Sequence, residues 1–450
     1  MTQPPKPDSR PDKVSLWHYA RLFRQDILSA QPARLYRAWM AEFKTPFFRS
    51  YLINQPELIK TVLKERPDDF PKSDRIGEGL RPLLGRSVFL TNGAVWKRQR
   101  RIIDPAFEGG RLRETFPAMW DAAEAMAKRF EDLTDQDVEI EAESSHAAAD
   151  VIFRTLFSIP IDHHVAHEVF DEFKTYQRSQ PILNIAAFIP LPRWLPRLFR
   201  RDTKRSAALI RRLITDLTTQ RMVEIDAGTA PLDLATKIMT TVDPVEGGAF
   251  TTEEMVDQVA IFFLAGHETS ASTLAWALYL LAAHPDWQDR LAKEAQQIET
   301  CDFAVMSKLR LSRDVFREAL RLYPPVPMMV REASCPERFR DRNVKVGSQL
   351  VISPWHLHRH ERLWDNPDSF DPNRWHTENG QKCQREAYLP FSAGARVCPG
   401  AGFAMVEGPL LLSRILRDFK VEPIEGRVPV PVAHLTVRSK DGIWLRLVRR

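Results

Sequence analysis

The sequence predicts a mainly α-helical fold, with a large helical domain and a smaller β-rich lobe. Residues 109–290 carry apolar side chains at helical spacing through most of their length. Proline becomes frequent after Pro324, where short strand-like stretches and loops replace the helical pattern. The 450 residues contain no internal repeat and no low-complexity linker. We therefore expect residues 14–450 to form a single domain.

The N-terminal part of the chain is predicted to begin with a disordered segment, followed by a strand and a helix. Residues 1–13 are rich in proline and charge, so we expect them to be disordered. Residues 47–54 (FFRSYLIN) are rich in aromatic and β-branched side chains and predict a strand. Residues 56–65 (PELIKTVLKE) predict a helix with proline in its first turn.

Two segments have the composition of functional loops. Residues 74–95 lack helical spacing and contain four glycines, and residues 181–201 are apolar, with prolines and four arginines. Long ordered loops inside a compact domain are usually lids or binding loops. Exposed, flexible linkers are the alternative interpretation.

A long helix is predicted from the capping box at residues 251–254 (TTEE) to about His284. The apolar stretch 260–283 is long enough to cross a bilayer. His267 and Glu268 lie in its middle, however, and an ionised carboxylate at membrane depth costs about 2.5–3.5 kcal/mol. A core helix of a globular protein is the better interpretation.

The middle of this helix, residues 265–270 (AGHETS), interrupts the apolar pattern. Gly266 costs about 1 kcal/mol in a helix interior, and Thr269 can bond back to a carbonyl one turn earlier. Both effects favour a local kink or widening, although close helix packing over the glycine is an equal alternative. The buried acid Glu268 beside Thr269 favours a functional role, because a buried carboxylate needs partners or carries protons.

A second helix, within residues 315–332, ends in a double proline and carries Glu318 and Arg321 three residues apart. An exposed pair at this spacing would contribute under about 1 kcal/mol and have no special meaning. Arg374 offers a second guanidinium. If the carboxylate is buried and shared by both arginines, the three residues form a structural clamp.

Composition excludes several classes of function. The net charge is +5 and the pI about 9.0, but the chain has no zinc-finger spacing, RNA-binding signature or basic tail, so we do not expect nucleic-acid binding. The N-terminus has no apolar signal core, and the cysteines form no CxxC motif. A reduced, cytoplasmic setting follows. The cysteines are Cys301, Cys335, Cys383 and Cys398.

The segment FSAGARVCPG, residues 391–400, places one of these cysteines between two glycines. A single cysteine is most often a small buried apolar side chain. The neighbouring residues are therefore needed to tell whether Cys398 is a buried packing residue or a functional one.

These motifs resemble the cytochrome P450 family of haem-thiolate monooxygenases, and the resemblance extends from about Tyr51 to Leu447. The family's haem loop, Phe-x-x-Gly-x-Arg-x-Cys-x-Gly, is matched by Phe391, Gly394, Arg396, Cys398 and Gly400. Its oxygen-activating helix motif is matched by Gly266, Glu268 and Thr269. Its Glu-x-x-Arg triad and its Trp-x-x-x-Arg helix are matched by Glu318, Arg321, Arg374, Trp96 and Arg100.

The resemblance implies the cytochrome P450 fold and haem b (iron protoporphyrin IX) as cofactor, with Cys398 as the iron ligand. Phe391 would pack beside the sulfur, and Gly394 and Gly400 would allow close approach of the loop to the porphyrin. Arginines would pair with the two propionates. Those implied for this role are Arg100, Arg331 and Arg396.

The implied activity is insertion of one oxygen atom from O2 into an apolar substrate of fatty-acid, terpenoid or steroid-like type. Glu268 and Thr269 would deliver protons. The candidate pocket residues are apolar and partly adaptable. They are Phe262, Ala265, Pro327, Met328 and Met329.

Electrons are expected from a separate ferredoxin and ferredoxin reductase, because the chain has no flavin or iron–sulfur signature. Lys97, Arg98 and Arg101 predict a basic docking face, with a merely solvated charged helix as the alternative. We expect a cytoplasmic monomer without a membrane anchor, similar to the soluble bacterial members. Two other functions stay open, a peroxide-driven peroxygenase and a haem-thiolate sensor or carrier without turnover.

Overall fold

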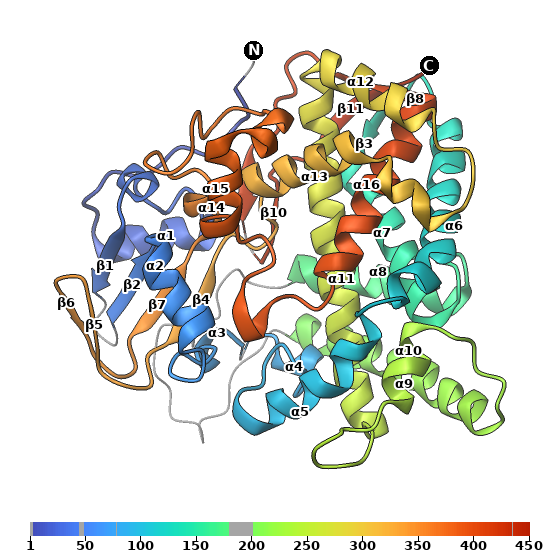
Figure 1. The fold of residues 1–450 in the computed structure, drawn as a ribbon, viewed down its shortest axis with the longest axis horizontal. Coiled ribbons are helices and arrows are strands. Elements are labelled where there is room, and N and C mark those ends of the chain that lie inside the picture. Colours follow the sequence, from blue (N-terminus) through green and yellow to red (C-terminus); the bar gives the residue numbers. More distant parts are fainter. Residues whose placement is uncertain (1–2, 45–48, 78, 180–200, 434) are drawn as a thin grey trace. The chain divides into compact units, whose positions relative to one another are not determined.

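A computed structural model describes residues 3–44, 49–77, 79–179, 201–433 and 435–450 of the protein (Figure 1). The chain divides into two compact units. Unit 1 comprises residues 1–70, 120–147 and 268–450, and unit 2 comprises residues 71–119 and 148–267. The boundary falls within three helices, so each of them contributes residues to both units. They are α6 (Arg111–Asp132), α7 (Ile140–Phe157) and α11 (Thr252–Ala282).

Unit 1 contains the β-sheets of the described chain. The largest has the strand order β1-β2-β7-β4, and Figure 1 shows its early, blue strands beside its later, orange ones. Its strands are β1 (Met40–Lys44), β2 (Arg49–Ile53), β7 (Gln349–Ile352) and β4 (Met329–Glu332). Strands β2 and β7 are parallel, and the other neighbours are antiparallel.

The smaller sheets of unit 1 are antiparallel and come mainly from the C-terminal part of the chain. One has the order β3-β11-β8, and the others pair β9 with β10 and β5 with β6. Their bounds are β3 (Asp137–Glu139), β5 (Glu337–Phe339), β6 (Arg342–Val344), β8 (Phe419–Pro423), β9 (Pro431–Ala433), β10 (Val437–Ser439) and β11 (Trp444–Arg449).

Helices of unit 1 surround two apolar cores. One core lies between the large sheet and the segment 357–393, where Trp364 and Trp375 are buried. In the other, α16 packs against α12 and α13. The helices are α1 (Leu16–Gln25), α2 (Pro56–Lys60), α12 (Pro285–Ala295), α13 (Arg310–Leu322), α14 (Pro354–Leu357), α15 (Glu378–Glu386) and α16 (Ala401–Asp418). Short turns add η1 (Ala33–Tyr36), η2 (Thr61–Glu65), η5 (Phe303–Ser307), η6 (Pro372–His376) and η7 (Gly394–Arg396).

The regular secondary structure of unit 2 among its described residues is helical, and its core contains a cluster of aromatic rings. The ring of Phe263 in α11 lies 4.4 Å from that of Phe153 and 6.1 Å from that of Phe173. The helices are α3 (Asp74–Gly77), α4 (Arg81–Leu84), α5 (Gly93–Ile103), α8 (His164–Ser179), α9 (Arg201–Asp226) and α10 (Leu234–Thr240), with η3 (Asp104–Ala106) after α5.

The predicted fold class is confirmed, since helices dominate and the strands form a smaller part. The capping box also forms: the Thr251 amide donates to Glu254, and the Glu254 amide donates to Thr251 Oγ1. The predicted helix at residues 56–65 is α-helical only in its first half, because η2 has π-helical hydrogen bonding. Residues 74–95 include the short helices α3 and α4 rather than one irregular loop.

Three further predictions are not tested by the described structure. Most of the predicted loop 181–201 lies outside the described residues. Disorder of residues 1–13 stays a prediction, although Tyr323 donates a hydrogen bond to the Pro5 carbonyl and Lys6 pairs with Asp368. The single domain 14–450 also stays a prediction. No helix among the described residues has the length and apolarity that a bilayer crossing requires.

Candidate functional site

The segment 391–400 of unit 1 forms a tight loop that ends at the start of α16. The Cys398 amide donates to the Phe391 carbonyl over 2.9 Å, and the Val397 amide donates to the Gly394 carbonyl over 3.0 Å. Gly394 has a φ of 68°, and a Cβ at this position would collide with the Leu63 carbonyl of η2. The loop therefore needs glycine here for both conformation and space. Within it, the Cys398 side chain is exposed, whereas Cys383 is buried.

Gly400 is less constrained by the protein itself. A Cβ at this position would lie 3.9 Å from Cys398 Sγ, which is an ordinary contact distance. Contacts with the described protein atoms therefore do not explain why position 400 is a glycine. Close approach of a bound group, as the sequence predicts, would explain it.

Arg331 in β4 is a buried cation in unit 1. Only 5% of the residue is exposed, and its Nη1 donates a 3.3 Å hydrogen bond to the Val330 carbonyl. Among the described residues, no carboxylate forms an ion pair with it, and burial lowers its pKa to about 10. A buried, uncompensated guanidinium is costly unless it receives an anion. Arg331 therefore fits a site that binds a group with carboxylates.

The other predicted cationic and aromatic residues divide between the units. Arg396, in η7 of unit 1, is partly exposed. Trp96 and Arg100 lie on α5 in unit 2, where Trp96 is 8% exposed. Arg100 Nε is 2.7 Å from a carboxylate oxygen of Asp104 one turn later.

One face of α11 is open along part of an otherwise buried helix. Every residue from Met255 to Leu278 is buried except Phe262, Ala265, Gly266 and Thr269. These positions follow the i, i+3, i+4, i+7 spacing, so they lie on one side of the helix. We call them the open stripe of α11. It contains four of the residues that the sequence singled out.

Helix α11 is a continuous α-helix across the open stripe, so the local widening that was one of the alternatives at this point is not seen. A Cβ on Gly266 would lie 2.5 Å from Ile152 Cδ1 of α7. The glycine thus allows close packing of the two helices, which was the alternative interpretation. His267, next to it, is buried, and its Nδ1 lies 2.7 Å from the Phe263 carbonyl.

Glu268 lies in unit 1 and is held by residues near the C-terminus. Its Oε1 accepts a hydrogen bond from Thr436 over 2.6 Å and one from Arg438 of β10 over 2.8 Å. The Glu268 side chain is 5% exposed and that of Arg438 is 42% exposed. An ion pair thus connects the buried acid to the protein surface. Thr269 follows on the helix, and its carbonyl accepts a hydrogen bond from Thr273.

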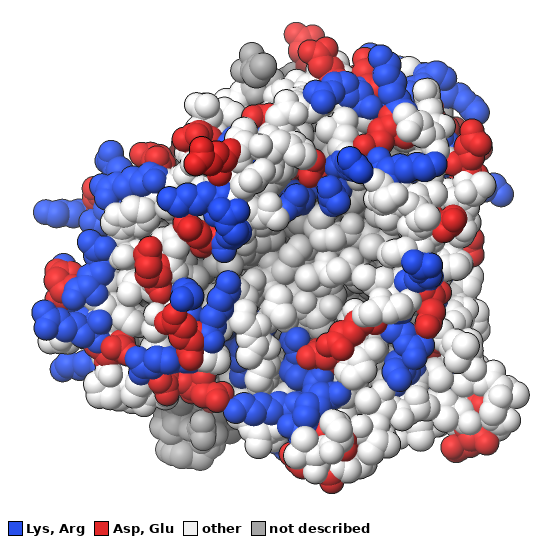
Figure 2. Space-filling view, in the orientation of Figure 1, with Lys and Arg blue, Asp and Glu red and all other residues white. Residues whose placement is uncertain are grey.

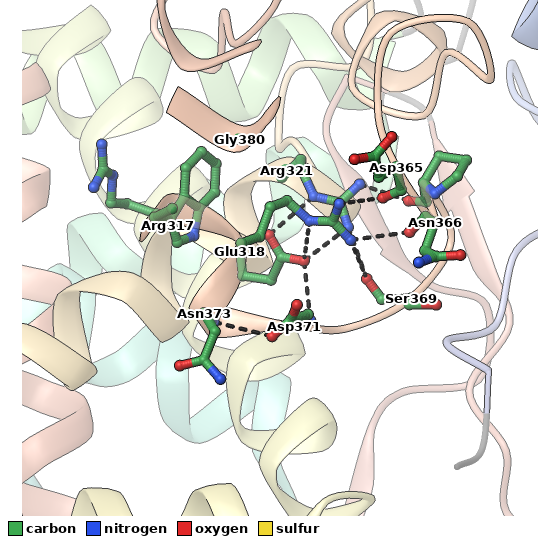
Figure 3. Close-up of polar contacts among 12 residues, drawn as sticks. Arg317, Glu318, Arg321, Asp365, Asn366, Ser369, Asp371, Asn373 and Gly380 are labelled. Carbon is green, nitrogen blue, oxygen red and sulfur yellow. Dashed lines mark hydrogen bonds and ion pairs between the residues drawn. The ribbon is translucent and has the colours of Figure 1, made fainter. Parts of the chain in front are cut away.

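The predicted clamp of Glu318, Arg321 and Arg374 is brought together in unit 1, and Figure 3 shows Glu318 beside Arg321. Arg321 Nη2 is 2.8 Å and Arg374 Nε is 3.2 Å from Glu318 Oε1. Both Glu318 and Arg321 are fully buried. Burial alone would raise the pKa of Glu318, but the two arginines hold it below the usual value. The alternative of an exposed ion pair is excluded by this burial.

The two guanidiniums of the clamp also bind backbone carbonyls of the segment 358–369. Arg321 donates to the carbonyls of His358, Pro367 and Ser369. Arg374 donates to those of Asp365 and Asn366. The clamp therefore fixes α13, η6 and this long segment as one body of unit 1.

The candidate pocket residues come from both units. In unit 2, the ring of Phe262 lies 5.7 Å from that of Phe107, and Ala265 is exposed on the open stripe. In unit 1, the buried Pro327 accepts hydrogen bonds from Trp355 and Ser353. Met328 and Met329 follow it and are partly exposed.

The sequence did not predict several residues that form polar contacts with side chains of α11. Thr436 and Arg438 bind Glu268 across 168 and 170 residues of sequence, and Ser270 binds Glu407 across 137. No local pattern predicts such distant pairs. In unit 2, Asp257 was also missed; it accepts hydrogen bonds from Arg211 and from the Arg86 amide.

Comparison with known proteins gives consistent matches. The family profile described as "Cytochrome P450" matches residues 39–445. The chain is 31% identical over 430 residues to "Cytochrome P450 4A14" of Rattus norvegicus, covering 91% of this chain and 82% of that protein. It is also 31% identical over 424 residues to "Cyclooctat-9-en-7-ol 5-monooxygenase" of Streptomyces melanosporofaciens, covering 91% and 88%.

A solved structure has a similar fold. The crystal structure of the cytochrome P450DA haem domain superposes with a TM-score of 0.81, at 24% sequence identity, and covers 99% of this chain and 98% of that one. The likeness extends over both units, since nearly the whole chain is matched.

Proposed function

The chain belongs to the cytochrome P450 family of haem monooxygenases, and on that premise we propose that Cys398 supplies the thiolate ligand of haem b. The observation that carries this proposal is the exposed Cys398 side chain on a loop held by the Phe391 carbonyl and by Gly394 against Leu63. A metal-bound sulfur needs a rigid loop that presents it at a fixed angle. When bound, cysteine-ligated haem supplies the oxygen activation of this family.

The propionates are proposed to bind arginines. Arg331 supports this best, because it is buried without an acidic partner in the described residues. Arg396 and Arg100 are assigned by the resemblance of their motifs. The protein's part is to neutralise two carboxylates that burial would otherwise penalise.

Proton delivery is proposed for Glu268 and Thr269. Support comes from the open stripe, on which Thr269 faces the less buried side of α11. Glu268, next to it, contacts Arg438, whose side chain is partly exposed. An acid that is buried but linked to a surface residue is suited to carrying protons inward.

The substrate is proposed to be an apolar organic molecule of fatty-acid, terpenoid or steroid-like type. Support comes from the character of the candidate residues: Phe262 and Ala265 are apolar residues of the open stripe, and Met328 and Met329 of unit 1 have adaptable side chains. The Streptomyces relative is named for oxidation of a cyclic unsaturated alcohol. A screen for ligand-induced changes in the haem absorption spectrum tests this class: apolar compounds should shift the spectrum and polar ones should not.

Electrons are proposed to come from a ferredoxin and its reductase. The predicted docking face is less positive than the sequence indicates, because two of its arginines are paired within unit 2. Arg98 bonds to Glu254, and Arg101 bonds to Asp243 and Glu246. Acidic and basic side chains are also mixed over the surface shown in Figure 2. Docking would then depend on shape as well as on charge.

Cys398→Ser tests the ligand assignment. We expect the variant to lose the carbon-monoxide band of the reduced, thiolate-ligated haem, because a serine hydroxyl is not a soft anionic ligand. Cys383→Ser, at a buried cysteine of α15 outside the segment 391–400, is the matched control and should keep the band. Survival of the band in Cys398→Ser would overturn the assignment.

A turnover assay separates the alternative functions. Product formed with reduced nicotinamide, ferredoxin and reductase supports the monooxygenase. Product formed only with peroxide identifies a peroxygenase. Ligand binding without product under either condition identifies a sensor or carrier.

A further inference from the structure

Residues 4–10 make long-range contacts with unit 1, and we call them the strap. The carbonyl of Pro5 accepts a 2.9 Å hydrogen bond from the hydroxyl of Tyr323. Lys6 forms an ion pair with Asp368. These partners lie 318 and 362 residues away in the sequence, so the contacts are tertiary rather than local.

The two ends of the strap are also held. Arg10 donates from its amide to the Gln31 carbonyl over 3.2 Å and from Nε to the Ala30 carbonyl over 2.6 Å. Arg10 and Pro32 form an isolated parallel bridge. At the other end, Pro4 is buried. The strap is thus attached at both ends and between them.

The composition of the strap lowers the entropic cost of docking. Pro4, Pro5 and Pro7 lie within it, and proline restricts the backbone of the undocked chain. An extended, proline-rich segment makes no internal hydrogen bonds, so its carbonyls stay available to a partner such as Tyr323. The composition that predicts disorder of an isolated segment therefore also suits a segment that becomes ordered on a surface.

Tyr323 is the anchor of the strap with the largest energetic consequence. It is fully buried at the C-cap of α13, and its ring stacks on that of Trp276 with the centroids 3.9 Å apart. Its hydroxyl donates to the Pro5 carbonyl. Release of the strap removes this acceptor, so either a buried hydroxyl stays unsatisfied or water enters beside the ring.

The ion pair of Lys6 involves an acid that also serves a buried cation. Asp368 binds Lys6 through Oδ2, and its Oδ1 lies 3.4 Å from Nε of Arg359. Arg359 is buried, with its guanidinium over the Trp355 ring. Lys6 Nζ also lies 4.9 Å from the centre of the Tyr36 ring. The strap therefore contacts the end of α13, η1 and the stretch that contains Asp368.

Tyr323 stands at the start of the segment that leads to the candidate site. Residues 324–331 run from Tyr323 into β4 and include Arg331 and the candidate pocket residues of unit 1. The Pro325 carbonyl in this segment accepts a 2.9 Å hydrogen bond from the Val437 amide of β10. A change in the position of Tyr323 is therefore passed on to both β4 and β10.

We propose that residues 4–10 are a docked strap that holds Tyr323 in place and thereby fixes the segment 324–331 of the candidate site. The docking is independent of the proposed function, whereas its effect on haem and substrate rests on it. Because the strap lies outside the helices and sheets of unit 1, it detaches more readily than the core unfolds. Each detachment loosens the segment 324–331, so the strap sets how tightly the site holds its ligands.

Proteolysis of the haem-loaded protein tests the docking. The protein is treated with proteinase K, and loss of the strap is followed by intact mass. The strap should be cleaved about tenfold more slowly than a synthetic peptide of residues 1–13, because a docked segment is cleaved only when it opens. Cleavage at the rate of the peptide would identify a disordered tail and overturn the proposal.

Tyr323→Phe removes only the hydroxyl that binds the strap. Its strap should be cleaved roughly fivefold faster than that of the wild type, as expected for the loss of one hydrogen bond. Tyr388→Phe is the matched control, because Tyr388 also donates to a backbone carbonyl, that of Arg317, but outside the strap. Equal cleavage rates in the two variants would contradict the role of Tyr323.

Deletion of residues 3–10 tests the effect on the site. Hydrogen exchange of the haem-loaded variant should be faster than in the wild type for peptides that cover residues 324–331 and unchanged for α9 of unit 2. Haem should also pass several-fold faster to a competing apoprotein. Tyr323→Phe provides the same measurements if the deletion variant does not fold. Unchanged exchange at residues 324–331 would overturn the proposal even if the strap is docked.

The two readouts separate the strap from the proposed function. Faster exchange at residues 324–331 with unchanged haem transfer would support the strap, and the proposed contact of Arg331 with a propionate would fail instead. Faster exchange together with faster haem transfer would support both.

Discussion

At the scale of single residues, Arg331 shows how burial indicates a binding role. It lies in β4, burial lowers its pKa to about 10, and its recorded hydrogen bond goes to a backbone carbonyl. A structural arginine at this depth would be expected to have a carboxylate partner, as Arg321 has in Glu318. The protein thus carries an electrostatic cost at Arg331 that a bound carboxylate would offset.

Arg331→Met is expected to separate the electrostatic cost of the buried cation from its contribution to haem binding. The haem-free variant should be at least as stable as the wild type, because an apolar side chain replaces a buried cation. The haem-loaded variant should lose haem several-fold faster to a competing apoprotein. The measurements are urea unfolding of the haem-free protein and the rate of haem transfer.

Arg342→Met is the matched control for this substitution, since Arg342 is exposed in β6 and, among the described residues, pairs with the carboxylates of Glu42 and Asp341. It should change neither quantity by much. Equal haem loss from the wild type and Arg331→Met would show that Arg331 has another role.

At the scale of elements, glycines set how closely α16 and α11 pack against their neighbours. A Cβ on Gly408 of α16 would collide with the Phe316 ring of α13. A Cβ on Gly266 of α11 would meet Cδ1 and Cγ1 of Ile152, atoms of a flexible side chain. The α16 contact is therefore the stricter of the two, and α16 follows directly after the loop of Cys398.

Gly408→Ala is expected to lower the free energy of unfolding by about 1–3 kcal/mol, because overpacking forces helices or side chains apart. Adding Phe316→Leu should recover part of the loss by removing ring atoms. Gly110→Ala is the control, since a Cβ there has no neighbour within 4 Å. Equal stability of the two single alanine variants in urea would contradict the close contact.

Element prediction from the sequence succeeded where the signal was local. The capping box at Thr251 and the apolar spacing placed the start of α11 to within a residue. At residues 265–270 the sequence left two alternatives open, a kink or widening and close packing over Gly266, because it does not tell whether a glycine bends a helix or admits a neighbour; the continuous helix and the nearness of Ile152 favour close packing. That choice depends on a partner far away in the chain.

At the scale of the whole molecule, motif order along the chain predicted the fold class and the family. The clamp was predicted from Glu318, Arg321 and Arg374, and these residues do meet. The partners Thr436 and Arg438 of Glu268 were not predicted, since they come from a C-terminal segment without a motif. Long-range pairing of this kind follows from tertiary packing, which single-sequence patterns do not encode.

The last prediction concerns the clamp and its contribution to the stability of unit 1. Glu318 is shared by Arg321 and Arg374, and both arginines bind carbonyls of the segment 358–369. Glu318→Gln leaves two buried guanidiniums without their anion. We expect the free energy of unfolding at neutral pH to fall by about 3–5 kcal/mol.

The pH dependence of this loss has a definite sign. The folded-state pKa of Glu318 lies below its usual value of 4.5, so the carboxylate contributes fully at pH above that value. Its contribution is lost as the pH falls through the folded-state pKa. In urea unfolding, the gap between the wild type and Glu318→Gln should therefore be constant near neutral pH and shrink below about 4.5. Glu131→Gln removes an exposed carboxylate 4.0 Å from Arg449 and should cost under about 1 kcal/mol. If Glu318→Gln costs no more than this control, the clamp does not stabilise the fold.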